Sequence, residues 1–150
     1  MRLTIQRVTS ARVTVGERVV GAIGSGLVVF VGISRTDGEA EAAAMAAKLL
    51  ELRLFDGADG KGFDRSVRDV RGALLAVSQF TLYGDVRRGR RPSFDTAAPP
   101  AGAREVYDAF VRELRASGLS VETGEFQALM RVEVTNDGPV TILVDSDRTF

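Results

Sequence analysis

The order of strand-like and helix-like segments constrains the fold of this chain more than any other feature of its sequence. Residues 2–33 form a β-rich block, and residues 119–144 supply further strand-length stretches. Between them, two helix-forming stretches flank one apolar run that starts at Gly72. The order β-β-β-β-α-β-α-β-β-β lacks the strict alternation of a parallel α/β fold. We therefore predict a mixed, β-rich α/β fold: a curved, largely antiparallel, barrel-like sheet with two outer helices.

The boundaries of several elements can be predicted from local signals. The continuous apolar run Leu27–Val31 is expected to be a buried central strand. The first helix is expected to be capped by Thr36 or Asp37 and to extend to Leu54. The second helix is expected over 102–117, and the last three strands over 119–122, 129–134 and 140–144. The polar tail from Asp145 is expected to fray.

Length and composition indicate one ordinary globular domain, 1–150. The chain has 150 residues, 45% hydrophobic and 27% charged, which is enough apolar content for a sizeable core. No apolar run approaches the length that crosses a bilayer, and the first residues have no signal-peptide core. We expect a cytoplasmic protein that does not bind membranes.

The chain contains no histidine and no cysteine. This excludes the Ser-His-Asp and Cys-His pairs of nucleophile and base, and it also excludes the common zinc sites. Hydrolytic chemistry would then depend on hydroxyl groups, carboxylates, backbone dipoles or groups of the substrate. We expect no cofactor and no metal ion.

The segment Ser78–Leu82 is the first candidate for chemistry, because it follows an apolar strand and ends in polar groups. On a regular strand, Gln79 and Thr81 would share one face. If the strand ends here instead, the backbone N–H groups of Gln79 and Phe80 can form an oxyanion site. An ordinary polar turn at the end of a strand is the competing interpretation.

The segment Asn136–Thr141 is the second candidate, because it contains the step Gly138-Pro139. An X-Pro bond can be held cis by its surroundings, and glycine leaves no side chain in the way. Such a unit can direct two backbone carbonyls at one small ligand. The competing interpretation is a plain hairpin turn, since Asn-Asp-Gly-Pro is rich in turn-forming residues.

Four arginines lie close together around Gly89: Arg87, Arg88, Arg90 and Arg91. They can pair with phosphates or stack on a base. The chain has 20 basic and 20 acidic residues and zero net charge, which argues against a broad nucleic-acid surface. A local RNA contact and a solvated loop are equally good interpretations of this cluster.

Seven short segments, spread over the whole chain, match one known family in the same order and include both candidate segments. They are Ile5-Gln6-Arg7-Val8, Gly26-Leu27, Arg53-Leu54-Phe55, Ser78–Leu82, Arg91-Pro92-Ser93-Phe94, Thr123-Gly124-Glu125-Phe126 and Asn136–Thr141. With these segments the chain resembles the D-aminoacyl-tRNA deacylases over essentially its full length.

The resemblance implies a homodimeric editing hydrolase with its active site at the subunit interface. Such an enzyme cleaves the ester that joins a D-amino acid to the terminal adenosine of tRNA, and it also removes glycine from wrongly charged tRNA. The resemblance implies that the Gly138-Pro139 bond is cis and enters the partner's pocket, where its carbonyls exclude an L-amino acid. Asn136 belongs to the same motif.

The resemblance also assigns roles to residues outside that motif. Arg7 is expected to hold the motif in place, and Met130 is expected to pack near it. Phe63 is expected to occupy the place of a methionine in the amino-acid pocket, in a stretch that follows the family pattern only loosely. The four clustered arginines are expected to contact tRNA.

Ser78, Gln79, Phe80 and Thr81 are expected to surround the scissile ester. The resemblance leaves the catalytic mechanism open. Thr81 has no evident base to activate it as a nucleophile, so we favour assistance by the 2′-hydroxyl of the terminal ribose. Two other functions compete: a catalytically inactive dimeric RNA-binding protein of the same fold, and a general esterase. The missing histidine disfavours the esterase.

Overall fold

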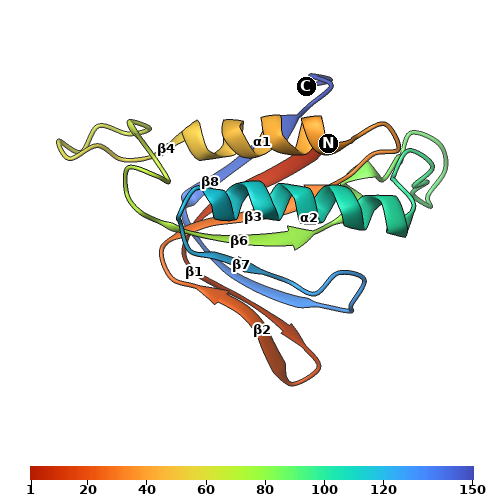
Figure 1. Cartoon of the computed structure of the whole chain (residues 1–150), viewed down its shortest axis with the longest axis horizontal. Coiled ribbons are helices and arrows are strands. Elements are labelled where there is room, and N and C mark those ends of the chain that lie inside the picture. Colours follow the sequence, from red (N-terminus) through yellow and green to blue (C-terminus); the bar gives the residue numbers. More distant parts are fainter.

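A mixed six-stranded sheet forms the body of the protein, with two α-helices on one of its faces (Figure 1). The computed structural model describes residues 1–150. Its elements are β1 (Arg2–Val15), β2 (Arg18–Ile23), β3 (Gly26–Gly32), α1 (Glu39–Glu51), β4 (Arg53–Phe55), β5 (Arg65–Ser66), β6 (Ala73–Ser78), the 3₁₀ helix η1 (Phe80–Tyr83), α2 (Pro100–Ala116), β7 (Val121–Thr123) and β8 (Arg131–Asp145). Neither α-helix combines the length and the apolar composition of a membrane span.

Strand β1 organises the sheet. On one edge its first half pairs antiparallel with β3 and its second half pairs antiparallel with β2. On the other edge it pairs with β8 along almost its whole length. Strands β3, β6 and β7 continue the sheet in parallel. The result is the predicted largely antiparallel, barrel-like sheet, with the β1–β2 hairpin extending away from the helices (Figure 1).

Both faces of the central strand β3 are buried, which explains its continuous apolar sequence. Leu27, Val29 and Val31 belong to the larger core, which lies between the sheet and the two helices. Val28 belongs to a smaller core inside the curve of the sheet, together with Val13 of β1. Full burial of each such side chain contributes about 1.5–3 kcal/mol relative to an exposed one. The prediction of a buried central strand at 27–31 is confirmed.

The first helix starts later than predicted. Helix α1 begins at Glu39, and the N–H of Gly38 donates a hydrogen bond to the Glu41 carboxylate (2.8 Å). The expected cap at Thr36 or Asp37 was wrong because Asp37 is engaged elsewhere. Its carboxylate accepts hydrogen bonds from the N–H of Ser34 (2.7 Å) and the amino group of Met1 (2.6 Å).

The end of the chain also differs from the prediction. The segments 129–134 and 140–144 belong to one strand, β8, so the expected hairpin turn between them does not exist. The first residues after Asp145 are held by hydrogen bonds instead of leaving the body of the protein. The N–H of Ser146 donates to the carbonyl of Met1 (2.9 Å), and the N–H of Asp147 donates to the Asp145 carboxylate (3.0 Å).

Candidate active site

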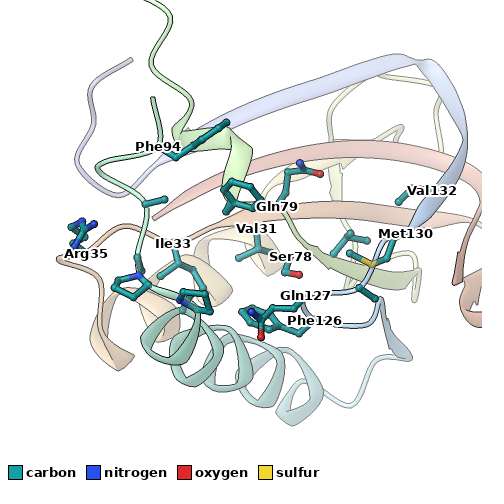
Figure 2. A pocket seen from close by; sticks show the side chains of 18 residues that line it. Val31, Ile33, Arg35, Ser78, Gln79, Phe94, Phe126, Gln127, Met130 and Val132 are labelled. Carbon is teal, nitrogen blue, oxygen red and sulfur yellow. The ribbon is translucent and has the colours of Figure 1, made fainter. Parts of the chain in front are cut away.

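A cavity of about 690 Å³ lies where the parallel strands β3 and β6 end. Twelve of its eighteen lining residues are hydrophobic, so it can enclose an apolar group. Figure 2 shows Ser78 and Gln79 between two ends of this pocket, with Arg35 at one end and Met130 and Val132 at the other. An apolar cavity with a few polar groups near its centre suits a ligand with both apolar and polar parts.

The segment Ser78–Leu82 does not continue as a regular strand at this pocket; the strand ends there, which is the second of the two alternatives given for it. Strand β6 ends at Ser78, and residues 80–83 form the 3₁₀ helix η1. Gln79 and Thr81 do not share a strand face; the side-chain amide of Gln79 instead donates a hydrogen bond to the Thr81 hydroxyl. Ser78, Gln79 and Phe80 line the cavity, whereas Thr81 is exposed and is not part of the lining.

The backbone donors of this segment differ in availability. The N–H of Gln79 donates to the carbonyl of Val31 (2.8 Å), so Gln79 is not a free oxyanion donor. The N–H groups of Phe80 and Thr81 open a 3₁₀ helix, and groups at that position have no partner inside their own helix. Of the backbone groups expected at the ester site, Phe80 and Thr81 are therefore the candidates to stabilise a developing negative charge.

The segment Asn136–Thr141 forms a wide bulge inside β8. Gln6 pairs with Thr141 and Val8 pairs with Asn136, so a step of two residues along β1 faces a step of five along β8. The extra residues leave the ladder and expose Asp137, Gly138 and Pro139 at the surface. The Gly138-Pro139 bond is cis, as the family resemblance implied.

Two side chains hold the bulge closed. The Asn136 amide accepts a hydrogen bond from the N–H of Val140 (2.7 Å) and donates one to the Val140 carbonyl (3.0 Å). Arg7 donates to the carbonyl of Asp137 (3.0 Å) and to the carbonyl of Leu54 (2.8 Å). Arg7 thus contacts the motif, as expected, and links it to β4.

The bulge and the pocket do not meet within one chain. Neither Arg7 nor any residue of 136–141 lines the cavity. Met130 does line it, at the end shown with Val132 in Figure 2. Phe63 does not line the pocket of its own chain either: it lies in the loop between β4 and β5 and is 56% exposed. Its place in the amino-acid pocket therefore stays a prediction.

The clustered arginines occupy a loop at the rim of the pocket. Backbone hydrogen bonds between Asp85 and Ser93 close the loop (2.7 and 2.9 Å). Just outside it, the rings of Phe80 and Phe94 meet edge to face at 5.0 Å, and both line the cavity. The loop therefore leads directly into Phe94, a residue of the pocket lining.

One of these arginines is already paired. Hydrogen bonds from the side chain and the backbone N–H of Arg87, together with its charge, lower the pKa of Asp85 to about 2. Arg88, Arg90 and Arg91 are exposed and form no ion pair. These three are the arginines that are free to meet phosphate groups.

The sequence of the chain matches the model of the family described as D-Tyr-tRNA(Tyr) deacylase over residues 4–145. That match covers nearly the whole chain. The chain belongs to this family.

Individual relatives agree with the family assignment. A D-aminoacyl-tRNA deacylase of Symbiobacterium thermophilum is 59% identical over 150 residues, covering 100% of this chain and 99% of the relative. Those of Koribacter versatilis and Thermotoga petrophila are 56% and 53% identical, each covering 100% of both chains.

Solved structures share the fold. The c-Myc DNA Unwinding Element Binding Protein superimposes with a TM-score of 0.92 at 42% identity, covering 97% of this chain and 99% of that one. A probable eukaryotic D-amino acid tRNA deacylase superimposes with a TM-score of 0.84 at 17% identity, covering 95% and 97%. The second likeness concerns the fold alone.

Several pocket residues of this family member were missed by the sequence reasoning. Arg35 closes one end of the cavity, and its guanidinium donates to the carbonyl of Asp95 (2.6 Å). Phe126 and Gln127 come from the loop between β7 and β8. No local sequence signal identifies them, because they meet through the parallel course of β3 and β6: parallel strands end at the same edge and bring the following loops together.

Replacing Asn136 by alanine is expected to loosen the bulge, because both hydrogen bonds to Val140 are lost. We expect the free energy of unfolding to fall by about 1–2 kcal/mol, measured by urea denaturation, and the Val140 amide to exchange faster with solvent. Thr135→Ala is the matched control, because Thr135 is exposed on the same strand and its side chain makes no hydrogen bond. Equal stability and equal exchange in both variants would contradict this role.

Proposed function

We propose that this protein is a D-aminoacyl-tRNA deacylase: it hydrolyses the ester between a D-amino acid and the 3′-terminal adenosine of tRNA. The observation that carries the proposal is full-length membership of the D-Tyr-tRNA(Tyr) deacylase family, together with a cavity at the predicted Ser78–Leu82 segment. The relatives that are named D-aminoacyl-tRNA deacylases match over the whole of their own length. We place the enzyme in the cytoplasm, where charged tRNA is used.

The mechanism we propose relies on the backbone and on the substrate. Water attacks the ester carbonyl carbon, and the N–H groups of Phe80 and Thr81 stabilise the oxyanion that forms. The neighbouring 2′-hydroxyl of the terminal ribose assists the attacking water, because the chain offers no histidine as a base. The bond from the carbonyl carbon to the ribose oxygen then breaks and leaves the free amino acid and tRNA.

We further propose that the bulge of one subunit enters the pocket of a second copy in a homodimer. This proposal is supported by the exposure of Gly138 and Pro139 and by their absence from the cavity of their own chain. The carbonyls of the bulge would form a rigid wall on one side of the substrate Cα. Such a wall distinguishes D from L, which a pocket that tests only size cannot do, because the two forms have equal volume and polarity.

The same arrangement also predicts how the enzyme treats glycyl-tRNA and where the tRNA body binds. Glycine has no side chain to meet the wall, so glycyl-tRNA would also be hydrolysed. Arg88, Arg90 and Arg91, in the loop that leads into Phe94, would pair with phosphates near the acceptor end, and Arg87 would do so only by exchanging its partner Asp85. A dimeric RNA-binding protein of the same fold without catalytic activity is the remaining alternative.

The proposal is tested with purified protein and three substrates: D-Tyr-tRNA, L-Tyr-tRNA and Gly-tRNA. We expect fast hydrolysis of the D and glycine esters and no hydrolysis of the L ester above the rate in buffer. Equal rates for D and L would overturn the stereochemical wall. Binding of tRNA without any hydrolysis would favour the inactive RNA-binding protein.

The part played by the ribose can be separated from that of Thr81. Thr81→Ala is expected to keep most of the hydrolytic rate, because the Thr81 hydroxyl lies outside the cavity and only its backbone N–H is needed. D-Tyr-tRNA that ends in 2′-deoxyadenosine is expected to react about a hundredfold more slowly with the wild-type enzyme. Complete loss in Thr81→Ala, with tRNA binding and stability unchanged, would instead make Thr81 the nucleophile.

The exchange of bulges between subunits can be tested by mixing two inactive chains. Ala128→Trp fills the pocket and leaves the bulge intact. Gly138→Ala leaves the pocket intact and distorts the bulge. The distortion is expected because the φ of Gly138 is +140° and an added Cβ would lie 2.7 Å from the Val140 side chain. Each variant alone is expected to be inactive yet folded. Co-expressed in equal amounts, they should recover about a quarter of the wild-type activity, since half of the dimers hold one intact site of two.

No recovery in that mixture would contradict a bulge that acts in the partner's pocket. A wild-type chain co-expressed with Ala128→Trp serves as the control for dilution of active subunits. Sedimentation of the mixture checks that heterodimers form.

A further inference from the structure

The start of β1 lies against the back of the 3₁₀ helix that carries part of the proposed ester site. The guanidinium of Arg2 donates a hydrogen bond to the carbonyl of Leu82 in η1 (3.0 Å) and lies 4.6 Å from the centre of the Tyr83 ring. Its Nε is 3.4 Å from the carboxylate of Asp145, whose side chain is almost fully buried. The Arg2 side chain itself is only 30% exposed.

The Leu82 carbonyl needs such a donor. The last carbonyls of any helix have no partner within it, and η1 has only four residues. The N–H of Gly84 donates to Thr81, and the N–H of Leu82 donates to Gln79, so these two backbone bonds leave the Leu82 carbonyl unused. Arg2 supplies a charged donor there, and charge-assisted hydrogen bonds are the stronger kind.

The start and the end of η1 are therefore fixed by different contacts. At the start, the N–H of Gln79 bonds to the Val31 carbonyl. Along its length, η1 lies directly on the backbone of Gly32, where an added Cβ would be 2.9 Å from the Cβ of Leu82. Those contacts set the distance of η1 from the sheet. The Arg2 bond ties its last turn to β1.

We propose that Arg2 is a positioning residue of the ester site: by holding the Leu82 carbonyl, it orients η1 so that the N–H groups of Phe80 and Thr81 point at the reacting carbonyl. The inference deepens the proposed deacylase function and rests on it. Arg2 does not touch the pocket, and its effect is exerted through the helix backbone. Displacement of aligned groups by about 1 Å can slow a reaction a hundredfold.

Asp145 keeps Arg2 in its place. Burial alone would raise the pKa of Asp145, but hydrogen bonds from Thr149 and from the N–H of Asp147, with the charge of Arg2, outweigh it and lower the pKa. The carboxylate is therefore ionised at neutral pH and faces a fixed positive partner. The Tyr83 phenol stays neutral, since burial first and the charge of Asp37 second raise its pKa.

The experiment compares Arg2→Met and Arg2→Lys with the wild type in steady-state hydrolysis of D-Tyr-tRNA. Methionine keeps an apolar stem over Tyr83 but has no hydrogen-bond donor. Lysine keeps the charge beside Asp145 but lacks the planar guanidinium that reaches both the Leu82 carbonyl and the Asp145 carboxylate. We expect kcat to fall about tenfold or more in Arg2→Met and about threefold in Arg2→Lys, with KM changed less than twofold, because neither the pocket nor the arginine loop is altered.

Two further measurements separate positioning from stability. Urea unfolding is expected to show Arg2→Lys close to the wild type, so that its loss of kcat does not follow a loss of stability. NMR is expected to show shifted amide signals for Phe80 and Thr81 in both variants. Arg112→Met is the matched control: it removes another arginine ion pair, with Glu39 on the helical side of the molecule, and should change neither kcat nor these signals.

Wild-type kcat in Arg2→Lys with unshifted amide signals would overturn the proposal, and so would a rise in KM alone. If Arg2→Met does not fold, Arg2→Lys decides the question. If the wild type itself hydrolyses no D-Tyr-tRNA, the proposed function fails, whereas the amide signals still report whether Arg2 sets the position of η1.

Discussion

The pairing of β1 with its three neighbours is the interaction on which the rest of the structure depends. Its hydrogen bonds with β3 and β8 hold the closed side of the sheet, and its second half carries the β2 hairpin. The same strand also reaches the two parts of the candidate site. Arg2, at its start, bonds to the helix that carries Phe80 and Thr81, and Arg7, five residues further along the strand, bonds to the bulge of β8. One rigid strand thus sets the position of both.

The sequence predicted the class of the fold well, because that depends on segment order and apolar periodicity. The buried strand at 27–31, the two outer helices and the mixed, mostly antiparallel sheet all follow from those patterns. Boundaries were less predictable where a tertiary contact overrides a local signal. Asp37 is a good helix cap by type, but it binds Ser34 and Met1, and the helix begins two residues later at Glu39.

The candidate site shows the same limit. Asn-Asp-Gly-Pro has the composition of a turn, and only long-range pairing with β1 turns it into a bulge in a continuous strand. Likewise the parallel pairing of β3 with β6 brings Arg35 near Ser78, and neither local sequence announces it. The motif Ser78–Leu82 could be recognised from sequence, but the sequence left open whether the strand continues past Ser78 or ends there, as the structure shows.

A chain without histidine places unusual weight on the backbone, and the structure is consistent with that demand. Side-chain catalysts can adjust their rotamers, but a backbone N–H can be aimed only by fixing the segment that carries it. Helix η1 is too short to be rigid by itself, so its orientation must come from outside contacts: the Val31 carbonyl, the close approach to Gly32 and the Arg2 guanidinium. The proposed wall built from the bulge would have the same requirement, and Asn136 and Arg7 hold the bulge by hydrogen bonds. The orientation of the catalytic N–H groups then depends on the contacts that hold their segment in place. Residues remote from the pocket should therefore affect the rate of hydrolysis more than is usual for a hydrolase.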